Sequence, residues 1–167
     1  MDTKFNKYIG LFGLCFILVA CGPGQQQVIN FNDTLVEEQT NVINTLDALY
    51  DTYSDYDPDK MEGALAMVEK NCIECLENLK NVNVESGEKM KSDVQRLCDY
   101  IYKKSQGNLK RVVELLSIPD EEYTEEFENE VSVLQAEVDS LVYELNEQFL
   151  ASQQAFANKH NFILTYD

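Results

Sequence analysis

Several residue types are scarce in this 167-residue chain, and each scarcity narrows what the protein can be. It has no tryptophan and one histidine, which leaves little for histidine-based metal binding or acid–base chemistry. Seven glycines and three prolines are few for a turn-rich β fold, so long helices are favoured. Basic residues number 13 against 30 acidic ones, and the charge of −17 argues against nucleic acid or an anionic membrane surface as a partner.

The first twenty residues have the pattern of an export signal. Lys4 and Lys7 precede an apolar run over residues 8–19. At ~1.5 Å per residue this run is too short to cross a hydrocarbon core of ~30 Å. A short basic region followed by a short apolar run is typical of a secretory signal peptide. We therefore predict that residues 1–20 are a signal peptide.

The apolar run ends in Leu18-Val19-Ala20-Cys21, which resembles the lipobox of bacterial lipoproteins. The resemblance implies that the Cys21 sulfur receives a diacylglycerol, that the signal is cut just before it, and that the new amine is acylated, for example with palmitate. Several acyl chains at one residue would anchor the protein stably in a membrane. Gly22 stands where some Gram-negative bacteria place an aspartate to retain lipoproteins at the inner membrane. The resemblance therefore favours the outer membrane and leaves the periplasmic or surface face open.

Beyond the signal, the hydrophobic pattern is helical throughout. Residues 21–29 hold the lipidated cysteine and a polar, glycine-containing stretch, where we predict a flexible tether. Apolar residues then recur at steps of three and four in four stretches, with Gly107 as a weak point in the third: 32–53, 61–82, 90–116 and 120–159. Short connections make consecutive helices antiparallel neighbours. We therefore predict one all-α domain over residues 30–167, an up-down-up-down four-helix bundle.

The charges of the last two stretches are opposite in sign. Residues 86–117 hold seven bases and four acids, whereas residues 120–160 hold eleven acids and one base. Folding these stretches together about residue 118 brings opposite charges level and would favour this pairing of helices. The expected pairs are Arg111 with Glu125, Lys110 with Glu126, Arg96 with Asp139, and Lys89 with Glu147. The acidic helix face over residues 120–130 could also attract a basic protein partner, although a solvated face that the third helix partly neutralises is the simpler explanation.

Three cysteines lie in the predicted helices. Cys72 and Cys75 form a C-x-x-C pair, but thioredoxin-like motifs stand at a strand-to-helix junction, which the helical pattern here does not provide. Folding the second and third helices about residue 85 places Cys72 level with Cys98, and disulfides can persist after export. A Cys72–Cys98 disulfide is therefore the first expectation, with Cys75 as the other possible thiol partner. Because helix axes lie ~8–10 Å apart and disulfides need Cα atoms within ~7 Å, free thiols stay an alternative.

No motif predicts a metal or a cofactor. The acids Asp55, Asp57 and Asp59 suggest a calcium loop, but an EF-hand would need glycine at Lys60 and glutamate at Ala66. A di-iron bundle would need Glu-x-x-His pairs, and the single histidine, His160, has Ala157 three residues before it. We therefore expect no metal site, no cofactor and no catalytic residues.

The chain as a whole resembles an uncharacterised family of helical bacterial surface lipoproteins. The shared features are the lipobox, Phe31-Asn32-Asp33 with Glu38-Gln39 at the start of the first helix, and the ending from Phe156-Ala157 to Leu164. The resemblance implies a lipid-anchored cell-envelope protein and carries over no catalytic residue. We therefore expect a non-enzymatic binding or structural role. The alternative is an envelope thiol-redox or stress-related protein that uses Cys72 and Cys75.

Overall fold

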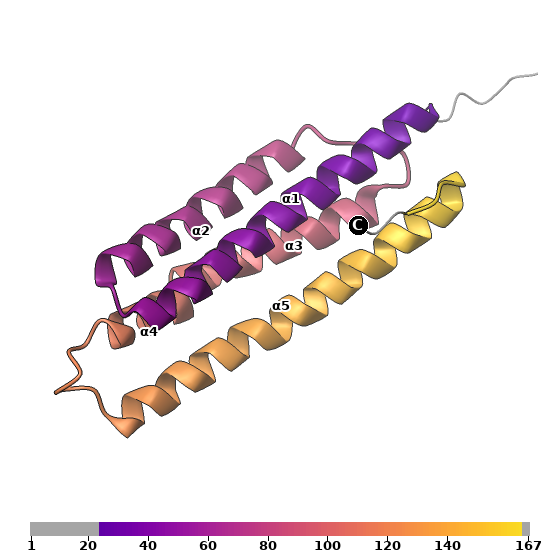
Figure 1. Cartoon of the computed structure of the whole chain (residues 1–167). Coiled ribbons are helices and arrows are strands. Elements are labelled where there is room, and N and C mark those ends of the chain that lie inside the picture. The colour runs from indigo at the N-terminus through magenta and orange to yellow at the C-terminus, as the bar shows by residue number, and fades with distance from the viewer. Residues whose placement is uncertain (1–23, 165–167) are drawn as a thin grey trace, which may run out of the picture.

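A computed structural model describes residues 24–164, and all regular structure within this range is helical (Figure 1). The elements are α1 Gln25–Thr52, the 3-10 turn η1 Tyr53–Asp55, α2 Pro58–Leu79, α3 Glu88–Ser105, α4 Asn108–Leu116 and α5 Glu125–His160. Helix α4 continues the path of α3 along the bundle, so the two together form its third member. The predicted all-α, up-down-up-down four-helix bundle is confirmed.

Helix α1 begins earlier than the sequence pattern suggests. Gly24 is its N-cap, and the first helical residue is Gln25. Val28 and Phe31 are both buried in the core, so this turn gains apolar contacts that favour helix formation. Glutamine is also a good helix former. The predicted flexible tether is therefore wrong over residues 25–29, and the bundle domain starts at residue 25 rather than 30.

The third member of the bundle is broken where a glycine interrupts the pattern. Helix α3 ends at Ser105, and α4 begins at Asn108 after two residues. Gly107 has φ −131° and ψ −93°, outside the helical region, and its N–H bonds to the Lys104 carbonyl. Leu109 and Val112, beyond the break, are completely buried. The break thus lets the chain keep its apolar face in the core over the whole length.

The last helix begins five residues later than predicted. Pro119 opens a turn rather than a helix, because its carbonyl accepts the N–H groups of Glu122 and Tyr123. The backbone is then extended at Thr124, whose hydroxyl caps α5 by accepting the Phe127 N–H at 3.4 Å. At the other end Asn161 is the C-cap and adopts the left-handed conformation, with φ 57°, which asparagine tolerates better than most residues.

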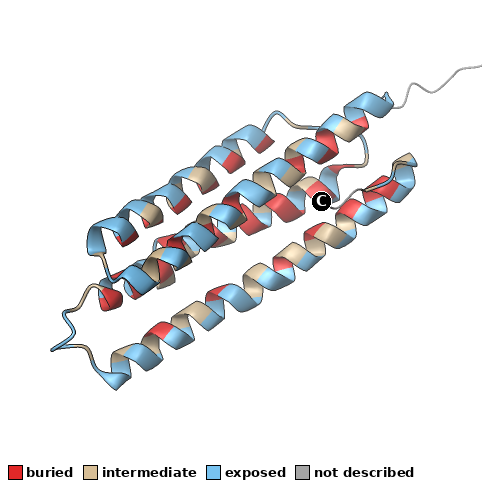
Figure 2. Ribbon diagram, in the orientation of Figure 1, coloured by how far each residue is buried: buried red, intermediate tan, exposed pale blue. Residues whose placement is uncertain are grey.

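Buried apolar residues form one core along the full bundle (Figure 2). Every helix contributes to it, and the largest fully buried side chains are Phe149, Leu35, Leu46, Leu49, Met61, Leu79, Met90, Leu97, Ile101, Leu109 and Leu115. On α5 the centre of the buried stripe runs through Val138, Leu145 and Phe149, while Leu141 is half-buried beside it. This continuous core is what stabilises helices that would be marginal in isolation.

Helices α1 and α5 approach each other less closely than the other neighbours in the bundle, and polar side chains bridge the space. The Gln39 amide donates to Asn146 Oδ1 at 2.6 Å, and the Tyr50 hydroxyl donates to Asp139 at 2.8 Å. Near the start of α1, the buried Gln153 amide donates to Asn32 Oδ1 at 3.1 Å. The α1–α5 contact therefore depends on specific hydrogen bonds as well as on apolar packing.

Gly87, in the connection before α3, lies directly under the Phe31 ring. A Cβ atom placed there would come within 2.4 Å of Phe31 Cζ. We therefore expect Gly87→Ala to lower the free energy of unfolding by about 1–3 kcal/mol, since the buried ring must shift. The matched control is Gly63→Ala in α2, where nothing lies within 4 Å and alanine should stabilise the helix by roughly 0.5–1 kcal/mol. Urea denaturation should show that Gly87→Ala lowers the free energy of unfolding and that Gly63→Ala raises it. Equal changes in the two variants would contradict the Phe31 contact.

Candidate functional site

The predicted signal peptide, residues 1–20, and the predicted lipidation site, Cys21, lie outside the described residues. Three residues separate Cys21 from Gln25, where α1 begins. Within residues 24–164, none of the helices is both long enough and apolar enough to cross a membrane.

The structure joins Cys75 to Cys98 by a disulfide, with 6.8 Å between their Cα atoms. The predicted Cys72–Cys98 bond is therefore wrong, and the partner is the second cysteine of the C-x-x-C pair. The bond connects α2 to α3 inside the core, where both cysteines are completely buried. It is a covalent cross-link between two adjacent helices, which we call the Cys75–Cys98 staple.

The direction of side chains explains why Cys75 is the partner. Counting from the middle of a connection aligns Cα atoms, whereas a disulfide joins side chains. Each Cα–Cβ bond tilts toward the N-terminus of its own helix. In antiparallel helices the two tilts point in opposite directions. Two side chains therefore meet when their residues have higher numbers than the pair whose Cα atoms lie at the same height. The preferred partner of Cys98 therefore moves one turn along α2, from Cys72 to Cys75.

Cys72 is left as a free, buried thiol. Burial, with a smaller contribution from the charge of Glu69, raises the pKa of this thiol to about 12. Because the thiolate is the nucleophile, Cys72 is unreactive at neutral pH. The two cysteines of the C-x-x-C pair thus have different states and do not form a dithiol centre.

The disulfide assignment can be tested by mapping. We expect non-reducing mass spectrometry, after alkylation of free thiols in denaturant, to find Cys75 linked to Cys98 and Cys72 alkylated. Cleavage after Glu74 separates Cys72 from Cys75, so the two pairings give different peptides. The Cys72→Ala variant is the control and should keep the bond. A linked peptide containing Cys72 in the wild type would contradict the assignment.

The acids of the first turn are used in local structure. Asp57 caps α2 by accepting the Lys60 N–H at 3.3 Å. Asp55 forms an ion pair with the Lys60 ammonium group at 2.9 Å. In the described part of the chain, no group of histidine, cysteine, aspartate or glutamate side chains is arranged to hold a metal ion.

Ion pairs join α3 and α4 to α5, but in a different register from the predicted one. Arg111 pairs with Glu130 at 2.8 Å, and Lys104 pairs with Glu137 at 2.5 Å. Arg96, expected opposite Asp139, donates instead to Gln148 at 2.8 Å. The predicted pairs of Arg111 with Glu125, Lys110 with Glu126, Arg96 with Asp139, and Lys89 with Glu147 are wrong, because α5 starts later and the chain folds back nearer residue 120. Lys89 instead forms an ion pair with the buried Asp93 of its own helix, at 2.5 Å.

These ion pairs lower the pKa of two carboxyl groups on α5. The hydrogen bond from Arg111 lowers the pKa of the Glu130 carboxyl. The hydrogen bonds from Lys104 and then Asn108 lower the pKa of Glu137. Basic α3 and α4 thus neutralise part of α5, as the opposite charges of the two stretches predicted, although each exposed pair contributes only ~0–1 kcal/mol.

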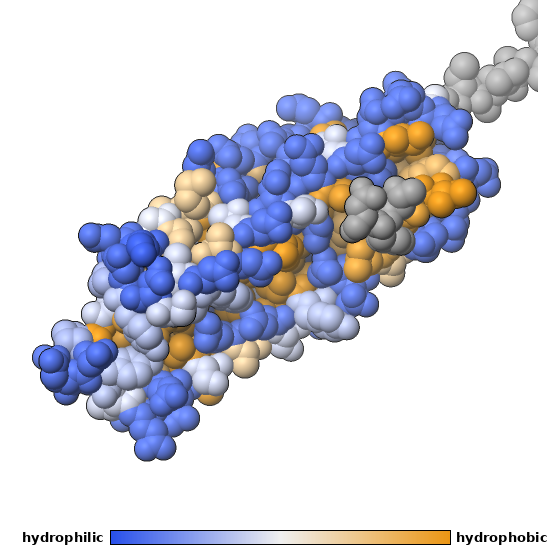
Figure 3. Space-filling model, viewed as in Figure 1, coloured by the Kyte–Doolittle hydropathy of each residue, from blue (hydrophilic) through white to orange (hydrophobic). Residues whose placement is uncertain are grey.

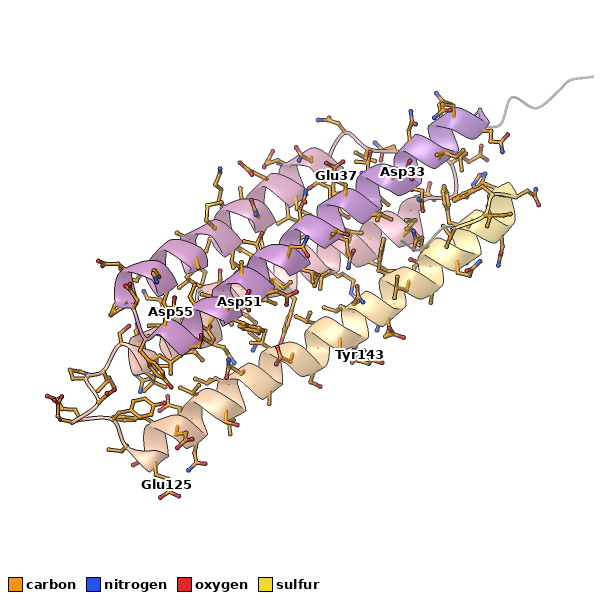
Figure 4. The ribbon with its side chains drawn as sticks, viewed as in Figure 1. Asp33, Glu37, Asp51, Asp55, Glu125 and Tyr143 are labelled. Carbon is orange, nitrogen blue, oxygen red and sulfur yellow. A yellow bond between two sulfur atoms is a disulfide. The ribbon has the colours of Figure 1, made fainter. Side chains whose placement is uncertain are left out.

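Nine of the acids lie close together at one end of the bundle, which we call the acidic end, residues 51–60 and 117–126; Asp51, Asp55 and Glu125 mark it in Figure 4. It holds one base, Lys60, and nine acids: Asp51, Asp55, Asp57, Asp59, Asp120, Glu121, Glu122, Glu125 and Glu126. All but Asp57, which is half-buried, are exposed. This part of the surface can bind a basic partner by charge complementarity.

A groove of about 390 Å³ lies between α1 and residues 81–85. Two larger grooves also run beside α1. One, of about 500 Å³, lies between α1, α5 and residues 162–164, with Asn32 and Gln153 in its wall. The other, of about 510 Å³, lies between α1 and α2 and is lined by small or uncharged residues such as Asn44, Ala64 and Met67. Neither groove contains a nucleophile paired with a base, which is the arrangement that covalent catalysis requires.

Comparison of the chain with family models, with curated proteins and with solved structures finds no match. The likeness to helical surface lipoproteins therefore stays a resemblance of motifs.

Proposed function

We propose that this chain is a lipid-anchored protein of the bacterial cell envelope, held by acyl chains on Cys21 at the outer membrane. Its bundle serves as a non-enzymatic binding or structural module. The lipobox supports the anchor. The Cys75–Cys98 disulfide supports export, since such bonds persist in oxidising compartments.

The observation that carries the binding role is the unequal distribution of charge. The acidic end holds nine carboxylates and a single lysine, whereas the acids further along α5 are partly neutralised by Arg111 and Lys104. Asp55 and Asp57 take part in an ion pair and a helix cap, and the other seven carboxylates stay free to attract a cationic surface. A basic protein surface is the partner that the acidic end fits best.

A cross-linking experiment in cells tests this role. A carbodiimide joins carboxylates directly to lysine amines of a bound partner. We expect the triple variant Asp120→Asn, Glu121→Gln and Glu122→Gln to lose at least 80% of the cross-linked product, because the local field that attracts the partner is weakened. The cross-linked species is identified by mass spectrometry.

The control neutralises three exposed acids nearer the other end, Asp99→Asn, Glu144→Gln and Glu147→Gln. This variant has the same net charge and should keep the product. Equal losses in both variants would mean that total charge, rather than the acidic end, governs the contact.

The alternative of a thiol-redox or stress-related protein has less support. Such a role needs an accessible dithiol with a lowered pKa. Cys75 is bonded to Cys98, and the Cys72 thiol is buried with a raised pKa.

A further inference from the structure

The short link between the acylated residue and α1 limits where the bundle can lie. An extended chain spans at most ~3.6 Å per residue, so Gln25 lies within about 15 Å of Cys21 whatever path residues 22–24 take. If Cys21 is anchored as proposed, the end of the bundle where α1 begins cannot leave the membrane surface. The bundle is therefore held against the bilayer rather than displayed on a long spacer.

Three segments meet at this end (Figure 1), which we call the anchor end, residues 24–33, 80–91 and 157–164. Phe31 of α1 packs on Phe156 of α5 with 5.2 Å between ring centroids, and its ring also covers Gly87. The Ser86 hydroxyl lies 3.0 Å from His160 Nε2. These contacts fix the start of α1, the α2–α3 connection and the end of α5 as one surface.

The anchor end has one large, almost fully exposed apolar side chain and several apolar side chains that are only partly buried. Ile163 is 90% exposed, the most exposed of the large apolar side chains in the described range. Ile29, Val82, Val84 and Leu164 are partly exposed in the same three segments. Figure 3 shows apolar residues at this end of the molecule and mainly polar ones at the acidic end. Beside Ile163, Phe162 is partly buried and packs its ring against Phe156.

The anchor end is also less acidic than the chain as a whole. Its segments hold four lysines, Lys80, Lys89, Lys91 and Lys159, against three acids, Asp33, Glu85 and Glu88. Lys80 and Lys89 form ion pairs with Glu77 and Asp93, whereas Lys91 and Lys159 have no ion pair within residues 24–164. The acidic end lies at the opposite end of a bundle whose longest helix, with 36 residues, is about 54 Å long. Charges that far away are screened by salt over ~10 Å, so they do not repel a surface placed at the anchor end.

We infer that the anchor end is a membrane-contacting surface, with Ile163 in the interfacial region of the bilayer and the lysines against phosphate headgroups. The partner is a phospholipid bilayer that contains anionic lipids. Exposed apolar residues beside lysines are the combination that binds such an interface. The net charge of −17 argues against binding to an anionic membrane. Because the acidic end lies at the opposite end of the bundle, its charge does not prevent the anchor end from contacting such a membrane. The inference rests on the proposed acylation of Cys21, and it directs the acidic end away from the bilayer.

The absence of tryptophan makes a direct test possible. The Ile163→Trp variant of the full, acylated protein is placed in vesicles of phosphatidylethanolamine and phosphatidylglycerol with brominated acyl chains. We expect its fluorescence to shift to the blue and to be quenched at least twofold relative to unbrominated vesicles. The matched control is Tyr56→Trp, a 61% exposed position at the acidic end, which should not be quenched. Equal quenching at both positions, or at neither, would overturn the inference.

A second set of variants tests the lysines. Replacing Lys80, Lys91 and Lys159 by glutamine in the Ile163→Trp protein should reduce quenching by at least half, and the same replacement of Lys60, Lys70 and Lys103 should not. No difference between the two sets would overturn the headgroup contact.

Mass spectrometry of the same samples reports acylation separately. An unacylated protein that fails to enter vesicles would refute the proposed anchor, whereas an acylated, vesicle-bound protein without quenching at residue 163 would refute only the membrane-contacting surface.

Discussion

Replacing Phe149 by alanine is expected to lower the free energy of unfolding by about 3–5 kcal/mol. Phe149 is the largest of the fully buried side chains, with 1% of its surface exposed, and it lies in the half of α5 that faces α1. The substitution removes apolar contacts and leaves a cavity, because the polar seam between α1 and α5 has few groups that can fill the space. Domains of this size are stable by only ~5–15 kcal/mol, so the loss is a large fraction of the total.

Urea denaturation followed by circular dichroism measures this effect on the chain from Gly24 onward. The control is Val133→Ala on the same helix, where 66% of the side chain is exposed and the change should stay within about 0.5 kcal/mol. If both variants unfolded at the same urea concentration as the wild type, the assignment of the buried face of α5 would be wrong.

The second large effect is expected at Cys21. The Cys21→Ala variant has no sulfur to receive the diacylglycerol, so the lipobox resemblance predicts that the signal peptide stays uncleaved and that no acyl chain is added. The mass of this precursor would exceed that of the mature chain by the mass of the signal peptide, less the mass of the lipid that it lacks. Mass spectrometry and detergent-phase partitioning measure both differences.

A matched control is available in the same segment. Cys15 lies six residues before Cys21 within the apolar run, and alanine there preserves the apolar character. Cys15→Ala should therefore be processed and acylated normally. A Cys21→Ala protein that matured at the normal size and stayed in the detergent phase would remove the basis for the proposed anchor.

Together, the two proposals define how the bundle is oriented relative to the membrane. With the anchor end on the bilayer, α5 would carry the acidic end some 50 Å from the lipid surface, given ~1.5 Å per helical residue. A partner bound at the acidic end would then approach from the side away from the membrane. The Cys75–Cys98 staple and the ion pairs of Arg111 and Lys104 hold neighbouring helices together between these ends.

Some features of the fold follow from sequence periodicity alone. The spacing of Leu35, Val42, Leu46 and Leu49 predicts one face of a helix, and all four residues are buried. Asp57-Pro58 predicts a helix start, and Asp57 is the N-cap of α2 with Pro58 in its first turn. These predictions succeed because capping and amphipathic periodicity depend on residues within a few positions of one another.

Register between helices was harder to predict. The start of α5 depends on the turn at Pro119, and five residues of delay changed every cross-helix ion pair that was predicted. The choice between Cys72 and Cys75 likewise depends on the opposite tilts of side chains in antiparallel helices. A difference of one turn, about 5.4 Å, is enough to decide a contact, and a count from the middle of a connection is not accurate to one turn.

The sequence by itself thus determined the helical class, the number of bundle members and the break at Gly107, since these are local properties of the chain. Tertiary structure decided that residues 25–29 belong to the bundle, because Val28 gains its stability from contacts with distant helices. It also decided that Cys75 is bonded and Cys72 is free, and that Ile163 and the lysines of two separate segments share one end with the start of α1. Residues far apart in sequence form a common surface only when packing fixes the relative positions of their helices.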